Sequence, residues 1–248
     1  MKIKLSIMLM LTLVCSVTKA EQVCEKNKAL LGAHYQLINS QVNIIDDKPS
    51  IKDEVIKSSA LWRQNQKVLF VDGEKSTTWF NLNNGLVQRT AHFDHFKRSI
   101  EYQAKPMSVV HWQQISQMIP NIEIKSLNFS GSQLKGCYHQ ETYQWENKAT
   151  SLQGKLVWNA DLKLVTELTI RQGNRQSHWQ LERVEQNKDI IEAEFEQRAA
   201  YQATDFADIG DNESDPFLIK MINLGFVEHS SSGVYNTQGE NMAIQHNH

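Results

Sequence analysis

Carboxylates are densest in one short segment near the C-terminal end of the chain, directly before a helix that the sequence predicts. Five of them fall within residues 205–215: Asp205, Asp208, Asp211, Glu213 and Asp215. Acidic loops supply the oxygen ligands that Ca²⁺ prefers, so the segment is a candidate site for Ca²⁺ or another divalent cation. The spacing lacks the glycine and terminal glutamate of a helix-loop-helix calcium loop. The alternative is structural, with Ser214 or Asp215 capping the helix and the other carboxylates bonding backbone amides or basic side chains.

A second cluster with possible chemistry is the run His92-Phe93-Asp94-His95-Phe96. On a strand, His92 and Asp94 would share one face while Phe93 and His95 share the other. Two imidazoles are half of a transition-metal site, which further strands would have to complete. The simpler interpretation, which we favour, is a strand with Phe93 on its inner face.

Neither composition nor motifs indicate an enzyme. The mature part of the chain has no HExxH, CxxC, P-loop, GxGxxG or GxSxG motif. A formal net charge of -2 over 248 residues excludes a strongly basic nucleic-acid binder, so no nucleic-acid partner is expected. We therefore expect a non-catalytic protein without an obligatory cofactor.

The first twenty residues resemble a secretory signal peptide. A basic start at residues 1–4 is followed by an uncharged apolar run over residues 5–17 and by Thr18-Lys19-Ala20, which predicts cleavage after Ala20. The apolar run is too short to span a bilayer, and no later stretch is apolar enough to do so. The sequence thus predicts a soluble protein exported to the periplasm, without a transmembrane segment in the mature chain.

Two cysteines remain after this cleavage, Cys24 and Cys137. In an oxidising compartment an isolated pair more often forms a disulfide than a catalytic site. The predicted bridge would join the mature N-terminus to the middle of the chain. Two free thiols are the alternative.

Alternation with a period of two dominates from about Tyr35 onward and indicates antiparallel strands with one solvent-facing side. Residues 162–171 alternate leucine, threonine and isoleucine with mostly polar side chains, and residues 191–196 alternate apolar residues with glutamate, so both segments are expected to be strands. Hairpin turns are expected at residues 71–74, 83–85, 172–174 and 185–188. The prediction is nine to eleven strands, most of them sequential neighbours.

Two short helices interrupt the strands in this prediction. The first runs from a cap at Ser108 to about Met118, is ended by Pro120, and carries Val109, Trp112, Ile115 and Ile119 on one face. The second begins at residue 214 or 215 and is ended by Gly225. Its apolar stripe consists of Phe217, Leu218, Met221 and Ile222.

The fold class expected is mainly β (α+β): a long curved antiparallel meander, as a half-barrel or open barrel, with two short helices. Residues 21–229 form a single β-rich domain in this prediction, and residues 230–248 form a flexible tail. A long sheet with few helices must curl around something, and its concavity is a natural place for an apolar ligand.

The run DFADIGDNESDPF at residues 205–217, followed by Lys220-Met221 and Gly225-Phe226, resembles the C-terminal signature of uncharacterised exported proteins of Gram-negative bacteria. Residues 154–164, with Val157-Trp158-Asn159, look like the strand pair before that signature. The strand-helix-strand order is also similar to the lipoprotein-localisation carriers (LolA/LolB-like), whose bent sheet holds acyl chains. This second resemblance is at the level of the fold, and no functional residue of the carriers is matched.

Three functions follow as hypotheses. The leading one is a periplasmic binding or carrier protein for a hydrophobic ligand, a lipid or an acylated molecule. The first alternative is a structural or interaction module of the cell envelope that docks a basic partner protein through residues 205–215. The second is a divalent-metal-binding protein or metal-dependent enzyme that uses the same carboxylates.

Overall fold

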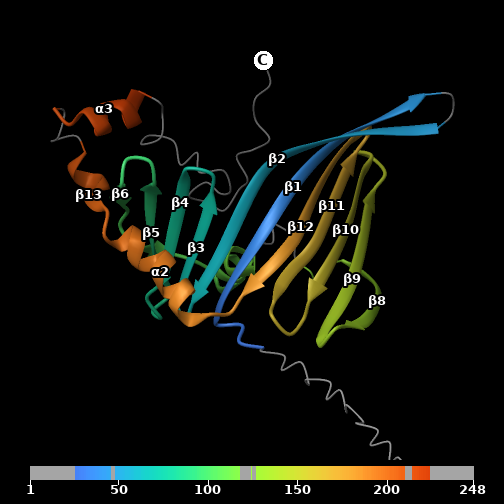
Figure 1. Ribbon diagram of the computed structural model, residues 1–248, viewed down its shortest axis with the longest axis horizontal. Coiled ribbons are helices and arrows are strands. Elements are labelled where there is room, and N and C mark those ends of the chain that lie inside the picture. The colour runs from blue at the N-terminus through green and yellow to red at the C-terminus, as the bar shows by residue number, and fades with distance from the viewer. Residues whose placement is uncertain (1–25, 46–47, 118–123, 125–126, 210–213, 224–248) are drawn as a thin grey trace, which may run out of the picture.

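The computed structural model describes residues 26–45, 48–117, 124, 127–209 and 214–223, and their strands form one extended sheet (Figure 1). The strands are β1 Leu30–Ile45, β2 Lys48–Gln64, β3 Lys67–Asp72, β4 Lys75–Asn81, β5 Leu86–Phe93, β6 Arg98–Glu101, β7 Lys105–Pro106, β8 Asn128–Lys135, β9 Tyr138–Asn147, β10 Leu152–Asn159, β11 Leu164–Gln172, β12 Arg175–Glu185 and β13 Gln202–Asp205. The helices are α1 Val109–Gln117, α2 Lys188–Ala199 and α3 Pro216–Asn223, with a 3-10 turn, η2, at Phe206–Asp208.

The sheet is built from two antiparallel meanders joined side by side. One runs from β6 back to β1 and the other from β12 back to β8, and the pairing of β1 with β12 joins them. β13 adds to β6 in parallel, and β7 pairs with β5. Because β13 and β8 lie at opposite ends of the strand order, the described sheet is open rather than closed into a barrel. The expected fold class, a long curved antiparallel meander, is confirmed.

Two of the expected hairpin turns form around a glycine with a left-handed backbone conformation. Gly73 joins β3 to β4 with φ +62°, and Gly173 joins β11 to β12 with φ +59°. A side chain at either position would be strained, since L-residues seldom adopt positive φ. Residues 82–85 likewise connect β4 to β5. Local turn chemistry therefore predicted these connections correctly.

The strand expected at residues 191–196 is wrong, because this segment belongs to α2, and the fold has three α-helices instead of two. Asn187 does not form a hairpin turn but caps α2 by accepting a hydrogen bond from the backbone N of Asp189 at 2.9 Å. The buried residues of the helix are Ile191, Phe195 and Arg198, which are spaced as one helical face. The alternation with glutamate concealed the helical spacing, because residues four apart, such as Ile191 and Phe195, fit both the strand period of two and the helical period of 3.6.

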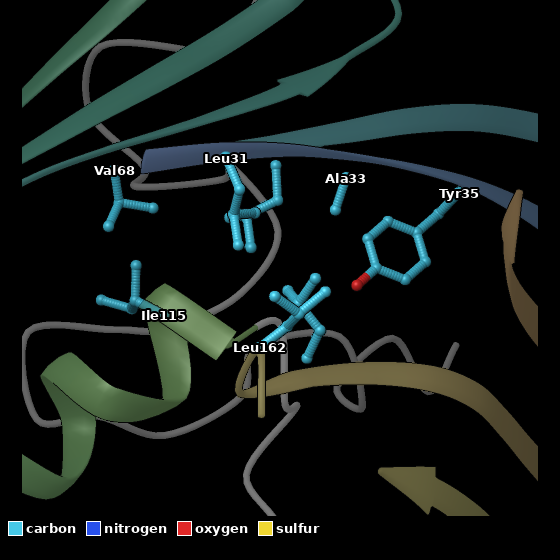
Figure 2. Packing of buried hydrophobic residues seen from close by; sticks show 8 residues of the cluster. Leu31, Ala33, Tyr35, Val68, Ile115 and Leu162 are labelled. Atoms are coloured by element: carbon cyan, nitrogen blue, oxygen red, sulfur yellow. The ribbon is translucent and has the colours of Figure 1, made fainter. Parts of the chain in front are cut away.

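The two faces of the sheet are covered by different helices. Leu61 of β2 packs in a cluster with Ile115 of α1, whereas its neighbour Trp62 packs with Ile191 and Phe195 of α2. Successive side chains of a strand point to opposite faces, so α1 and α2 lie on opposite sides. We call these sides the α1 face and the α2 face. Figure 2 shows the α1 face from close by, with Ile115 pointing from the helix towards β1 and β2.

Both expected helices form, but each has an exposed residue on its predicted apolar face; in α3 this residue is Ile222, which is 39% exposed. Ser108 caps α1 by accepting a hydrogen bond from the backbone N of His111 at 3.1 Å. Ile115 is buried as expected, but Val109 is 72% exposed and does not share the packed face. Ile119 lies outside the described residues. None of the described helices is long and apolar enough to cross a membrane.

Candidate ligand-binding face

One apolar side chain from each of six neighbouring strands lines up across half of the sheet. Each of these residues is paired directly with the next in the strand register, from β1 through β12, β11, β10 and β9 to β8. The apolar row, as we name it, consists of Leu37, Trp179, Leu168, Leu156, Tyr143 and Phe129. Side chains at directly paired positions lie about 5 Å apart, so the row is a continuous strip.

The apolar row lies on the α1 face. Tyr35 precedes Leu37 by two residues and packs in the same cluster as Ile115 of α1. Leu181 follows Trp179 by two residues and packs against that cluster as well. Because side chains alternate along a strand, both relationships place the row on the side that α1 covers.

Burial changes along the row. Leu168 and Leu156, in its middle, are 2% and 1% exposed, whereas Phe129 at its outer end on β8 is 60% exposed. Phe129 meets Tyr143 edge to face, with ring centroids 5.8 Å apart. The Tyr143 hydroxyl donates to Glu141 at 2.7 Å, and burial together with this bond raises the pKa of Tyr143 to about 12. The row therefore runs from a packed core to an aromatic surface open to solvent.

Tryptophan side chains extend the apolar surface on either side of the apolar row. The ring of Trp145 on β9 lies over Gly154 of β10, where a Cβ would overlap the indole. The cluster around the row also contains Trp158 and Val165. Ile170, together with Ile124 and Leu127 from the segment after α1, packs against it. Three of the six tryptophans thus gather here, at positions 145, 158 and 179. The other three tryptophans, Trp62, Trp79 and Trp112, pack in the clusters around α1 and α2.

A hollow of about 550 Å³ lies over the same strands, and most of the residues that line it are polar, although Phe129 of the row and Trp145 also contribute to its lining. Gln144, Lys155 and Thr169 line it, and each of them is next in sequence to a member of the apolar row. These side chains therefore point to the face opposite to the row. Placing an acyl chain there would remove water from amide and charged groups without replacing their hydrogen bonds. The polar side of the hollow therefore suits a hydrophobic ligand less well than the row does.

Two polar side chains lie within the otherwise apolar cluster under α1. The Tyr35 hydroxyl donates to the Val165 carbonyl at 2.9 Å, and Figure 2 shows the hydroxyl pointing from β1 towards the strand below it. Arg63 of β2 donates from Nη2 to the Leu162 carbonyl at 2.7 Å. Burial raises the pKa of Tyr35 and lowers that of Arg63 to about 10. Both groups hold the chain around Leu162 against the sheet.

The acidic segment is described in part. Asp205 caps η2 by accepting a hydrogen bond from the backbone N of Ala207 at 2.8 Å, and Asp208 lies within η2. Asp211 and Glu213 lie outside the described residues. The carboxylate of Asp205 therefore has the structural role that the alternative interpretation gave it.

Asp215 has two roles at the start of α3. It accepts a hydrogen bond from the backbone N of Phe217 at 2.8 Å and forms an ion pair with Nη2 of Arg98 at 2.7 Å. The hydrogen bond from Arg98 lowers the pKa of Asp215. Within the described part of the chain no group of three or more His, Cys, Asp or Glu could hold a metal ion. The divalent-cation site at Asp205, Asp208, Asp211, Glu213 and Asp215 stays a prediction.

The histidine cluster is divided between a strand and a turn. β5 ends at Phe93, which packs against Phe217 of α3, so Asp94 and His95 lie in the turn that follows. His92 is 5% exposed, and its ring nitrogens lie 2.7 Å from Ser99 Oγ and 2.8 Å from Thr78 Oγ1. The expectation that Phe93 faces inward is met, but the strand does not extend to His95. His92 is a hydrogen-bonded core residue.

Cys137 lies in the turn between β8 and β9, and Cys24 lies outside the described residues. The predicted disulfide between Cys24 and Cys137 therefore stays a prediction. The same holds for cleavage after Ala20 and for the tail at residues 230–248, since both lie outside the described part.

No protein-family model and no curated protein matches the chain. Among solved structures, the chain is similar to a domain from Vibrio parahaemolyticus described as an outer membrane lipoprotein-sorting protein, at 7% identity, over 64% of this chain and 91% of that one, with a TM-score of 0.22. It is also similar to the Mycobacterium tuberculosis lipoprotein LppX, at 11% identity, over 64% of this chain and 89% of that one, with a TM-score of 0.26.

Sequence reasoning found part of the candidate face and missed the rest. The alternation at residues 162–171 already contained Leu168, a member of the row. Its partners could not be recognised, because pairing β1 with β12 joins residues far apart in the chain. Nothing in the local sequence distinguishes Arg63 from an ordinary solvent-facing strand residue.

Proposed function

We propose that this chain is an exported binding or carrier protein for a hydrophobic ligand that bears an acyl chain, and that the acyl chain lies along the apolar row. The observation that supports the proposal is the unbroken course of the row from buried Leu156 to exposed Phe129. A continuous apolar strip that ends in an aromatic side chain 60% exposed is typical of a surface that an apolar ligand or partner covers.

Burial of the acyl carbons supplies most of the affinity in this proposal. Each buried CH₂ contributes about 0.8 kcal/mol, so a long chain that is only partly covered still gains several kcal/mol. A flat strip of Leu, Tyr, Trp and Phe binds by contact area and not by directed hydrogen bonds. We therefore expect affinity to rise with acyl chain length.

Displacement of a fluorescent fatty acid from the delipidated mature protein tests the proposal. We expect saturable binding, with Phe129→Ala weakening it by about tenfold, because the loss of one buried aromatic contact corresponds to at least about 1.4 kcal/mol. Phe129 is open to solvent, so this variant should fold normally. Absence of saturable binding to the unaltered chain would contradict the proposed function.

Phe80→Ala is the matched control. Phe80 on β4 is also an exposed phenylalanine, with 37% of its surface open to solvent. Its neighbour Trp79 packs in the α1-face cluster, so Phe80 points to the α2 face. We expect its substitution to leave fatty-acid binding unchanged, and an equal loss in both variants would show that the effect is not specific to the row.

Native mass spectrometry of protein released gently from the periplasm separates this function from its alternatives. Added mass that matches an acyl lipid supports the carrier. A stoichiometric Ca²⁺ or other metal would instead support the site at residues 205–215, and a chain without ligand that crosslinks to a basic envelope protein would support the interaction module. A mature N-terminus at Glu21 in the same sample would agree with export.

A further inference from the structure

The most buried arginines of the described chain differ in whether a carboxylate pairs with the guanidinium. Arg198 is 6% exposed and pairs with Asp94 at 3.2 Å and with Glu194 at 2.8 Å. Arg98, with a side chain 14% exposed, pairs with Asp215 at 2.7 Å. Arg63 is 7% exposed, yet within the described residues its only hydrogen bond is to a backbone carbonyl and it forms no ion pair.

The surroundings of Arg63 are apolar. Its partners across the strands are Leu31 of β1 and Val68 of β3, which are 0% and 1% exposed. Its Nε is buried without a hydrogen-bond partner, so a guanidinium with five N–H donors uses few of them. Burial lowers its pKa to about 10, which still leaves it a cation at neutral pH. A buried cation without a counter-charge is unfavourable, and the fold keeps one here.

Arg63 also lies on the face that carries the proposed ligand. It follows Leu61 of the α1-face cluster by two residues, so both point to the α1 face. Arg63 pairs with Leu31, which precedes Leu37 of the apolar row by six residues on β1. At the rise of a strand this separation is about 20 Å, a distance that a long extended acyl chain can span.

We propose that Arg63 binds the anionic head group of the ligand, so that the ligand class is an acyl chain with a terminal carboxylate or phosphate. This inference rests on the proposed function. The head group supplies the counter-charge that the described residues lack and accepts hydrogen bonds from the unused guanidinium donors, as carboxylates and phosphates do for arginine. The acyl chain extends from there towards the apolar row.

In this proposal the head group enters when α1 moves, because Ile115 of α1 packs in the same cluster as Leu31 and Val68, the strand partners of Arg63. Ile115 is the one buried residue of this nine-residue helix, so little apolar contact holds the helix in place. Trp112, half-buried on the same helix, packs against the cluster from its edge. Displacement of α1 opens a path to Arg63 without disturbing the strand pairing.

Calorimetric titration of the delipidated mature protein with hexadecanoic acid, hexadecyl phosphate and hexadecanol, whose chains are long enough to reach from Arg63 to the apolar row, tests the proposal. The three probes have alkyl chains of the same length and differ only in the head group, which is a carboxylate, a phosphate or a hydroxyl. We expect at least one of the two anions to bind about tenfold more tightly than the alcohol, and the preferred anion identifies the head group. In Arg63→Met this preference disappears while the affinity for hexadecanol stays within about twofold.

Arg183→Met is the matched control, because Arg183 is an exposed arginine of β12 paired with His34 on the α2 face. It should keep the anion preference. Thermal unfolding establishes that each variant folds, and Arg63→Gln, which keeps a donor for the Leu162 carbonyl, replaces Arg63→Met if the latter does not fold.

The outcomes are distinguishable. Equal binding of all three probes by the unaltered chain overturns the role of Arg63 and leaves the hydrophobic-ligand function standing. An anion preference that survives in the Arg63 variants has the same consequence. Failure of all three probes to bind overturns the proposed function and this inference with it.

Discussion

Arg198 on α2 and Asp94 in the turn after β5 form an ion pair, with Nη2 of the arginine 3.2 Å from the carboxylate. The same guanidinium donates from Nε to the Ser76 hydroxyl at 2.8 Å and from Nη1 to Glu194 at 2.8 Å. The Arg198 side chain is 7% exposed, so this charge is almost completely removed from water. The pair ties α2 to β4 and β5, strands that precede it by a hundred residues.

Asp94→Ala is expected to lower the free energy of unfolding by about 3 kcal/mol, since it removes one of two carboxylates from a buried guanidinium. Urea unfolding measures the change. The control is Glu192→Ala, which breaks the exposed pair of Lys188 and Glu192 on the same helix and should change stability by less than about 0.5 kcal/mol. Equal losses in the two variants would show that the Arg198 pair does not anchor α2.

His92 makes stability depend on pH. Burial, and next the charge of Arg198, lower its pKa from 6.5 to about 4. The unfolded chain therefore binds this proton more readily than the folded one, and the stability that neutral His92 provides is present above pH 6.5 and is lost as the pH falls towards 4. The loss amounts to about 3 kcal/mol at most.

Urea unfolding at pH 7.5 and at pH 4.5 tests this pH dependence. His92→Gln should reduce the difference between the two pH values, because glutamine does not titrate. His95→Gln, at an exposed position three residues on, serves as the control and should keep the full difference. A pH dependence that is the same in all three proteins would mean that other groups cause it.

Gly154→Ala is expected to destabilise the candidate ligand-binding face by about 1–3 kcal/mol, because its Cβ would overlap the ring of Trp145. Tryptophan fluorescence should shift as the indole is displaced towards solvent. The double variant Gly154→Ala/Trp145→Ala removes the clash, so the two changes should be less than additive. Strict additivity would show that the ring does not depend on the glycine.

The predicted disulfide makes the mature chain two hydrogens lighter than its reduced form. Closing a loop of over a hundred residues between Cys24 and Cys137 stabilises the fold by up to about 4–5 kcal/mol through loop-closure entropy. Cys137→Ala should therefore lower the Tm and abolish the effect of a reductant on it. An unaltered chain whose mass and Tm do not respond to reductant would contradict the bridge.

Local sequence was sufficient for the features that depend on neighbouring residues. Gly73 and Gly173 marked hairpins because few other residues adopt their backbone conformation, and Asp215 with Pro216 marked the start of α3 because caps act within one turn of helix. The wrong prediction of a strand at residues 191–196 also comes from relying on local sequence alone. Ile191 and Phe195 satisfy both a strand period and a helical period over so few residues, and only Trp62 and Leu69 across the α2 face favour the helix.

By itself, then, the sequence determined the class of fold, three of its hairpin turns and two of its helices, since these follow from short-range conformational preferences. The tertiary structure alone decided that β1 pairs with β12, which brings Leu37 opposite Trp179 and completes the apolar row. It also decided that Arg63 is buried without a carboxylate while Arg198 has two. Pairing and burial between distant segments depend on which surfaces the folded sheet brings together, and no local pattern encodes that.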